Sequence, residues 1–269
     1  MDIIKSLFRE RLTQLTIAFF LILSAWWVII FLSKTTDAPA NHTFGFIYGG
    51  FSLWGGFLGF LTARKWGGFK STMGKAVLFL TFGLLLQAFG QYSFWFYNYF
   101  LRIAVPYPGI PDIGYFGTIP FYILAAILIA KVSGVKVSLK SYANKAQAIL
   151  IPLIILGIGY FLFLKNYDFN GASPLQVFLD FGYPLGQATY ISIGILTFSL
   201  SRGILGGLMK SRIIFIILAF FLQFLADYIF IYFHNLYFPA SFIDYFYLLA
   251  YAVMSLSIIE LKTVLNKID

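Results

Sequence analysis

The chain has no cysteine, only two histidines and few charged residues among its 269. Without cysteine it can form no disulfide, no thiolate metal site and no cysteine nucleophile. The histidines, His42 and His234, fall in separate segments, so we expect neither a metal site nor a cofactor. Charged residues make up 11% of the chain, against about 25% in a typical soluble domain. This shortage argues against a soluble globular protein.

The chain also lacks the short motifs of several common enzyme classes. It has no Gly-x-Ser-x-Gly turn, no His-Glu-x-x-His pair and no Walker phosphate-binding loop. No lysine falls in the middle of a late apolar segment, and no apolar segment is rich in arginine. Neither a retinal Schiff base nor a voltage sensor is therefore expected.

Apolar and aromatic residues dominate instead. They account for 60% and 21% of the chain, and the mean hydropathy is +0.86. We therefore expect an all-α polytopic membrane protein whose main partner is the lipid bilayer. A membrane-spanning helix needs about 20 mostly apolar residues. Eight segments satisfy this requirement: 14–32, 44–63, 76–98, 113–131, 146–164, 175–200, 212–234 and 239–260.

The basic residues lie between these segments and strongly favour one side. Only Lys34, Arg102 and Lys165 fall on the side opposite to the termini, out of 19 lysines and arginines. Cytoplasmic loops carry the excess of basic residues in membrane proteins. We therefore expect a multi-pass protein of the cell membrane with both termini cytoplasmic. Because the positive charge is distributed among the loops, it predicts topology and not a nucleic-acid partner.

The sequence reads as one four-span unit written twice, over residues 1–134 and 135–269. Gln87 and Gln91-Tyr92 in the first half match Gln223 and Asp227-Tyr228 in the second, and an Asp-x-x-Tyr follows in both halves, at Asp112 and Asp244. Four spans is an even number, so the two repeats would share one orientation. The alternative is that unrelated apolar helices merely look alike.

The polar residues of both repeats fall in the outer half of their spans when depth is counted at about 1.5 Å per residue. This clustering predicts an outward-facing ligand pocket between the halves. Its candidate residues are Gln91, Asp112, Tyr115, Asp180, Tyr183, Gln187, Asp227, Tyr228, Asp244 and Tyr247. Asp227 is the most informative of them, because a charged Asp near mid-helix costs about 2.5–3.5 kcal/mol. We expect it to hold a proton or to pair with Gln91 or a tyrosine.

Each candidate also has a structural interpretation. Gln87 and Gln223 are more simply explained as hydrogen-bonding links between helices. Asp112 and Asp244 lie near helix starts, where a carboxylate caps the first turn. Only Asp227 and Asp180 favour a functional role. Breaks at Pro120 and Pro184 are expected to open the spans towards a cavity.

The segment Val105 to Pro120, VPYPGIPDIGYFGTIP, resembles a Pro-rich signature of multi-span sensory modules. These modules precede bacterial diguanylate cyclases and histidine kinases. The segments Asp180 to Pro184 and Asp227 to Tyr247 are similar to later parts of them. The resemblance implies a sensor. No cyclase or kinase domain follows Glu260 in this sequence, so it also implies signalling through a separate cytoplasmic or membrane partner.

A second resemblance is to lysoplasmalogenase-type membrane enzymes, which have eight spans and Gly-Asp pairs within helices. The corresponding pairs here are Gly90-Gln91 and Ala226-Asp227. Three hypotheses therefore stand. The first is a sensor or receptor-like module that binds a small molecule or lipid. The second is a small-solute transporter. The third is an intramembrane lipid hydrolase that uses Asp227 and Asp180 as acid and base.

Overall fold

A computed structural model describes residues 10–135, 139–201, 207–233 and 236–265, and all regular elements within these ranges are helical. Each of the eight predicted spans coincides with one long helix. The helices are α2 (Arg11–Ser33), α3 (Pro39–Lys65), α4 (Thr72–Trp95), α5 (Ile110–Val132), α7 (Tyr142–Gly159), α8 (Pro174–Ser201), α9 (Gly207–Phe233) and α10 (Phe242–Leu265). A 3-10 turn, η1 (Gly68–Lys70), precedes α4, and the π-helical turns η2 (Phe96–Leu101) and η3 (Tyr160–Leu164) extend α4 and α7.

Within the described residues, seven of these helices are long and apolar enough to cross a membrane. The exception is α8, which is 28 residues long but more polar, since it carries Gln176, Asp180 and Gln187. A multi-pass membrane protein follows from these helices.

Local chemistry explains where several helices begin and end. Proline occupies the first turn of α3 and α5, where its missing N–H costs nothing. Ser71 caps α4 by accepting a hydrogen bond from the Gly74 N–H at 2.8 Å. Lys34 closes α2 with a left-handed φ of 56°. Residues 202–206, between α8 and α9, and His234 lie outside the described residues.

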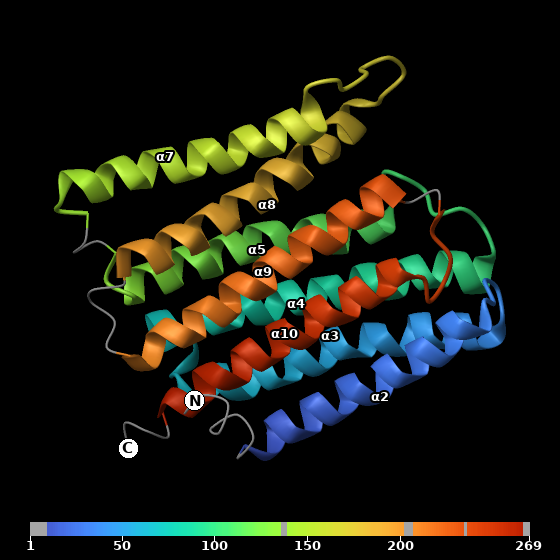
Figure 1. The fold of residues 1–269 in the computed structure, drawn as a ribbon, viewed down its shortest axis with the longest axis horizontal. Helices are drawn as coiled ribbons and strands as arrows, with labels where there is room; N and C mark the ends of the chain where they lie inside the picture. The colour runs from blue at the N-terminus through green and yellow to red at the C-terminus, as the bar shows by residue number, and fades with distance from the viewer. Residues whose placement is uncertain (1–9, 136–138, 202–206, 234–235, 266–269) are drawn as a thin grey trace.

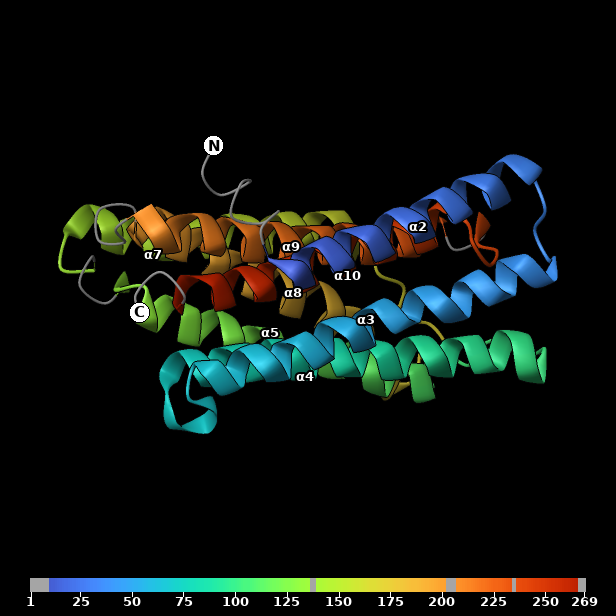
Figure 2. The same cartoon turned by 90° about the horizontal axis from the view of Figure 1, so that it is seen from below.

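Six of the helices form a closed ring. In order around it, α3, α4, α5, α8, α9 and α10 each pack on the next, and α10 packs on α3. The other two lie outside, α2 against α10 and α7 against α8 (Figure 1). Figure 2 shows α3, α4 and α5 together on one side of the molecule, with α9, α10 and α2 on the other. The first described helix, α2, thus lies against the last, α10.

The ring has two chemically different ends. At one end, on the right in Figure 1, α3, α5, α8 and α10 begin. We call it the acidic end, because Asp112 and Asp244 lie in the first turns of α5 and α10 and Asp180 lies in the second turn of α8. The opposite end, where α2 begins and α10 finishes, is the basic end. Lys70, Lys75 and Lys131 lie there.

Close helix packing inside the ring depends on glycine. A Cβ added at Gly114 of α5 would lie 2.4 Å from the backbone N of Gly90 in α4, and one at Gly83 would lie 2.2 Å from the ring of Tyr122. Small residues let helix backbones approach in this way. The expected breaks at Pro120 and Pro184 are not found, because α5 and α8 run as helices through both prolines. A proline is tolerated within a membrane helix where its neighbours satisfy the backbone groups that it frees.

Candidate functional site

Asp227 of α9 lies within the ring and accepts hydrogen bonds from three neutral side chains. Tyr247 of α10 donates to Oδ1 at 2.7 Å. Gln223, one turn earlier on α9, donates to the same oxygen at 3.2 Å. Gln187 of α8 donates to Oδ2. The carboxyl group therefore joins three consecutive helices of the ring.

The expected partnership of Asp227 with a tyrosine is present, but its amide partners are not the expected one. Gln91 accepts a hydrogen bond from Tyr115 at 3.1 Å instead. Gln223 belongs to the Asp227 group, where we expected only a link between helices. Gln87 does make such a link, by accepting from Tyr251 of α10 at 3.3 Å.

Asp244 and Asp112 both cap their own helices and both bind a tyrosine from the other half of the chain. Asp244 accepts from the Ala240 N–H at 2.8 Å and from Tyr48 of α3 at 2.9 Å. Asp112 accepts from the Gly109 N–H at 2.7 Å and from Tyr183 of α8 at 2.9 Å. The expected capping is thus accompanied by a hydrogen bond between adjacent helices of the two halves.

The two halves of the chain make matching bonds at matching positions. Tyr48 with Asp244 joins α3 to α10, as Tyr183 with Asp112 joins α8 to α5. The intra-half bonds match as well. Tyr115 of α5 donates to Gln91 of α4, as Tyr247 of α10 donates to Asp227 of α9. The chemical difference between the halves is that the first has an amide where the second has a carboxyl group.

Asp180 lies apart from Asp227 and serves a different contact. Its carboxyl group accepts from Tyr107, in the segment before α5, and from Tyr167, before α8, at 2.7 Å in the latter case. Gln187, which reaches Asp227, is seven residues further along α8, or about 10 Å at the helical rise. The structure therefore does not pair Asp180 with Asp227.

The two tyrosines that bind Asp180 have altered acidity. Hydrogen bonding to Asp180 and some burial raise the pKa of Tyr167 to about 12. Burial, together with the same carboxylate, also raises the pKa of Tyr107. Both effects arise because a phenolate next to a carboxylate would lose its hydrogen bond and be repelled.

No lysine or arginine approaches these carboxyl groups among the described residues of the acidic end. Lys34, Arg102 and Lys165 are all exposed there. The only described ion pair at this end joins His42 to Asp37 at 2.5 Å, and Asp37 is 88% exposed. Asp227, Asp112 and Asp244 are therefore balanced by neutral donors.

Buried side chains lie around Asp227, at the position of the predicted pocket. Gln187, Gln223 and Tyr251 are buried around Asp227. Tyr228, also a predicted site residue, is buried and packs edge-on against Phe224 at 4.1 Å between ring centres. Two surface hollows lie elsewhere. One of about 380 Å³ is on the apolar face of α7 and one of about 190 Å³ is between Phe46, Trp95 and Tyr99.

Sequence reasoning missed four tyrosines of this network: Tyr48, Tyr107, Tyr167 and Tyr237, the last of which also donates to Asp244. Tyr48 could have been found from the sequence. It lies next to a glycine in the second span of its half, and Tyr183 lies next to a glycine in the second span of the other half. The three others lie in or beside loops, where tyrosine reads as an interface residue.

Sequence reasoning also missed the ion pairs at the basic end. Arg212 of α9 and Glu260 of α10 are 1% and 0% exposed, with 3.4 Å between Nε and Oε2. Lys262 binds Glu10 at 2.5 Å. Although Glu260 is close to the end of the sequence, its side chain is buried inside the ring.

Within the described residues, no three His, Asp or Glu side chains lie together as a metal site requires. Comparison of the chain with protein-family models, with curated proteins and with solved structures found no match. The function is therefore inferred from the residues of the ring.

Proposed function

We propose that the chain is a sensor or receptor-like module of the cell membrane that binds a small molecule or lipid at Asp227. In this proposal α8 also spans the bilayer and completes eight spans, arranged as two parallel repeats. The acidic end faces outward and both termini are cytoplasmic. The excess of basic residues at the opposite end supports this orientation.

One observation carries the proposal. Gln91 and Asp227 occupy matching positions, and each accepts a hydrogen bond from the matching tyrosine of its own half. An amide at this position therefore suffices to hold the helices together. A charged Asp costs about 2.5–3.5 kcal/mol at the centre of a membrane helix. Its presence in only one half is best explained by a ligand that it binds.

The surroundings of Asp227 also favour a class of ligand. The charged groups described near the acidic ring positions are carboxyl groups, and the nearest basic side chains are exposed. A ligand with an ammonium or another hydrogen-bond-donating group is complementary to such a site, and an anionic group is not.

The test is to replace Asp227 with Asn, which keeps the size of the side chain and the hydrogen bond from Tyr247 but removes the charge. The purified protein in native-like lipid should retain small molecules detectable by native mass spectrometry, and Asp227→Asn should lose them. Asp37→Asn is the matched control, since Asp37 is an exposed carboxylate at the same end.

The proposal fails if the doubly substituted protein, Asp227→Asn with Asp180→Asn, retains the same bound molecules as the unchanged protein. A thermal unfolding midpoint that rises equally with ligand in both proteins would lead to the same conclusion.

A small-solute transporter is the second candidate, and the matching bonds of the two halves favour it. Related halves around a central site are typical of transporters that expose the site alternately to either side. Single cysteines near Gln187 and Gln223, introduced into this cysteine-free chain, would distinguish the two functions. A transporter requires them to react with impermeant thiol reagents from both sides, and a sensor from the outside only.

We do not retain the hydrolase hypothesis. Asp180 and Asp227 have different hydrogen-bond partners, and Gln187, which binds Asp227, lies about two helical turns beyond Asp180 on α8. The likeness to sensory modules supports the first candidate through its short motifs. A separate signalling partner is part of that proposal.

A further inference from the structure

The two halves of the ring meet at two interfaces, and these are unequally fastened. One interface joins α10 to α3 and the other joins α5 to α8. If the halves behave as units, the ring opens where it is fastened least. The distribution of hydrogen bonds between the halves therefore indicates which interface separates.

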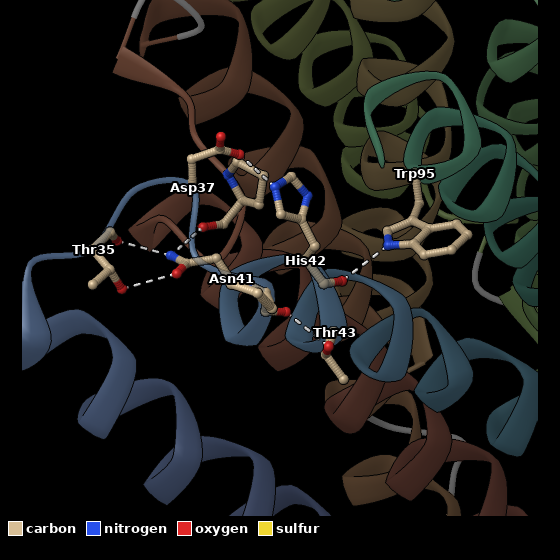
Figure 3. Close-up of polar contacts among 8 residues, drawn as sticks. Thr35, Asp37, Asn41, His42, Thr43 and Trp95 are labelled. Carbon is tan, nitrogen blue, oxygen red and sulfur yellow. Dashed lines mark hydrogen bonds and ion pairs between the residues drawn. The ribbon is translucent and has the colours of Figure 1, made fainter. Parts of the chain in front are cut away.

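The α10–α3 interface is bonded at both ends. At the acidic end, Asn41 Nδ2, with no exposed surface, donates to the Pro239 carbonyl at 2.9 Å, and its own loop is held by Thr35 (Figure 3). Nearby, Trp27 Nε1 of α2, also in the first half, donates to the Ala240 carbonyl just before α10 at 3.0 Å. At the basic end, Trp66 Nε1 donates to the Leu261 carbonyl at 2.9 Å.

Two further contacts attach α10 to the first half. Lys262 pairs with Glu10 at the basic end, and Tyr251 donates to Gln87 of α4 within the ring. Together with Tyr48 and Asp244, these contacts hold α10 over its whole length.

The α5–α8 interface is different. The side-chain hydrogen bonds that the described residues make across it lie at the acidic end, from Tyr183 to Asp112 and from Tyr107 to Asp180. Below them the contact is apolar. A Cβ at Gly186 would lie 2.4 Å from Cγ2 of Ile119, and a Cβ at Gly182 would lie 2.5 Å from the ring of Phe116.

Both helices of this interface also contain a proline near that contact. Pro120 follows Ile119 in α5, and Pro184 lies between Gly182 and Gly186 in α8. Each proline removes one backbone hydrogen bond from its helix. The helices are therefore weakened at the same level on both sides of one interface, and helices bend preferentially at such positions.

Separation here would also act on Asp227. Gln187 of α8 donates to Asp227, and it lies one turn beyond Tyr183 on the same helix. Opening at the Tyr183–Asp112 bond therefore also exposes the face of α8 that carries Gln187, the donor to Asp227. The interface and the proposed ligand site adjoin each other.

We propose that the α5–α8 interface opens sideways into the bilayer and that an amphipathic lipid reaches Asp227 through it. This inference rests on the proposed function, to which it adds the class of ligand and its route. The opened edge would present the Asp112 and Asp180 carboxylates at head-group level and Phe116 and Ile119 below them. Such an edge suits a lipid whose head group donates hydrogen bonds and whose chain is apolar.

The test uses a disulfide across each interface. Ile119→Cys with Gly186→Cys places the two Cβ atoms about as far apart as Ile119 Cβ and the ideal Cβ of Gly186, which is 3.6 Å. This lies within the usual disulfide range of about 3.5–4.5 Å. Gly55→Cys with Ser255→Cys is the matched control at the α10–α3 interface, where the corresponding distance is 3.4 Å.

The probe is a phosphatidylethanolamine with a diazirine on its acyl chain, in nanodiscs, with labelled peptides identified by mass spectrometry. Oxidation of the Ile119→Cys/Gly186→Cys protein should reduce labelling of the peptide that contains Asp227 at least fivefold, and reduction should restore it. Oxidation of the control pair should leave labelling unchanged. Tyr183→Phe, which removes one bond across the interface, should increase labelling without any cross-link.

Three results would overturn the inference. They are unchanged labelling after the α5–α8 cross-link, an equal loss with the control cross-link, and labelling confined to the outer faces of α2 and α7. Asp227→Asn separates this inference from the proposed function. If that substitution leaves probe access dependent on the interface but does not affect ligand retention, the function is wrong and the lateral opening stands.

Discussion

At the scale of single residues, the carboxyl groups of the ring share one solution to the cost of burying charge. Asp112, Asp227 and Asp244 each accept from a tyrosine and from at least one N–H group of an amide or the backbone. Neutral donors satisfy the oxygens without an ion pair. In the proposed function, this arrangement leaves the Asp227 carboxyl group available to a ligand that donates hydrogen bonds.

Tyr247→Phe tests the contribution of one such donor. It should lower the free energy of unfolding by about 0.6–1.7 kcal/mol, the range measured for hydrogen bonds between membrane helices. Tyr245→Phe is the control, because Tyr245 stacks on Trp27 at 4.4 Å and that contact does not need its hydroxyl group. Reversible unfolding in mixed micelles gives both values, and an equal effect of the two substitutions would contradict the assignment.

Asp180→Asn should lower the pKa of Tyr167 from about 12 towards the ordinary value of about 10. The folded-state pKa is raised, so the stabilising contribution of this bond is present below about pH 10. It is lost as the pH rises through about 12. A ¹³C-labelled tyrosine Cζ signal, followed by NMR against pH and assigned with Tyr167→Phe, measures the shift. An unchanged titration in Asp180→Asn would show that Asp180 is not the cause.

At the scale of helices, the sequence predicted which segments are helical better than how those helices run and pack. Each expected segment overlaps one long helix among the described residues, because 20-residue apolar runs leave the backbone few alternatives within a membrane. The breaks at Pro120 and Pro184 were predicted wrongly. A proline predicts the loss of one hydrogen bond, but whether the helix bends depends on neighbours such as Phe116 and Ile119, which the sequence does not place.

Gly114→Ala tests how closely α4 and α5 approach. The added methyl group would lie 2.4–2.5 Å from backbone atoms of Gly90 and Leu86, which cannot rotate away as a side chain can. We expect a loss of about 1–3 kcal/mol in the free energy of unfolding, as for other overpacked sites. Gly157→Ala in α7 is the control, because a Cβ there meets nothing within 4 Å. Equal thermal unfolding midpoints for the two variants would rule out the tight contact.

At the scale of the whole molecule, the sequence picked out most of the residues that join the helices by hydrogen bonds but not how they pair. The spacing of Gln87, Gln91 and Asp112 was sufficient to propose a repeat. The spacing could not show that Tyr48 and Tyr183 form hydrogen bonds between the two halves, since those bonds depend on the order of the helices around the ring. Ring-facing and lipid-facing side chains are both apolar, so hydrophobicity alone does not reveal that order.

The proposed orientation predicts a pattern of thiol labelling. Thr36→Cys and Asn170→Cys place exposed thiols at the acidic end, and Ser141→Cys places one at the basic end. In intact cells, an impermeant maleimide should label the first two and spare the third until the membrane is permeabilised. The chain contributes no background thiol. Labelling of Ser141→Cys alone in intact cells would reverse the orientation.

The position of α10 in the ring bears on how the protein is made. α10 follows every other ring helix in the chain, yet it supplies the carboxylate that Tyr48 needs and the hydroxyl group that Gln87 needs. Until α10 has been inserted, these groups of α3 and α4 have no such partner in the bilayer. A chain released before Phe242 would therefore leave these polar groups without those partners, and unsatisfied polar groups are costly within the hydrocarbon core.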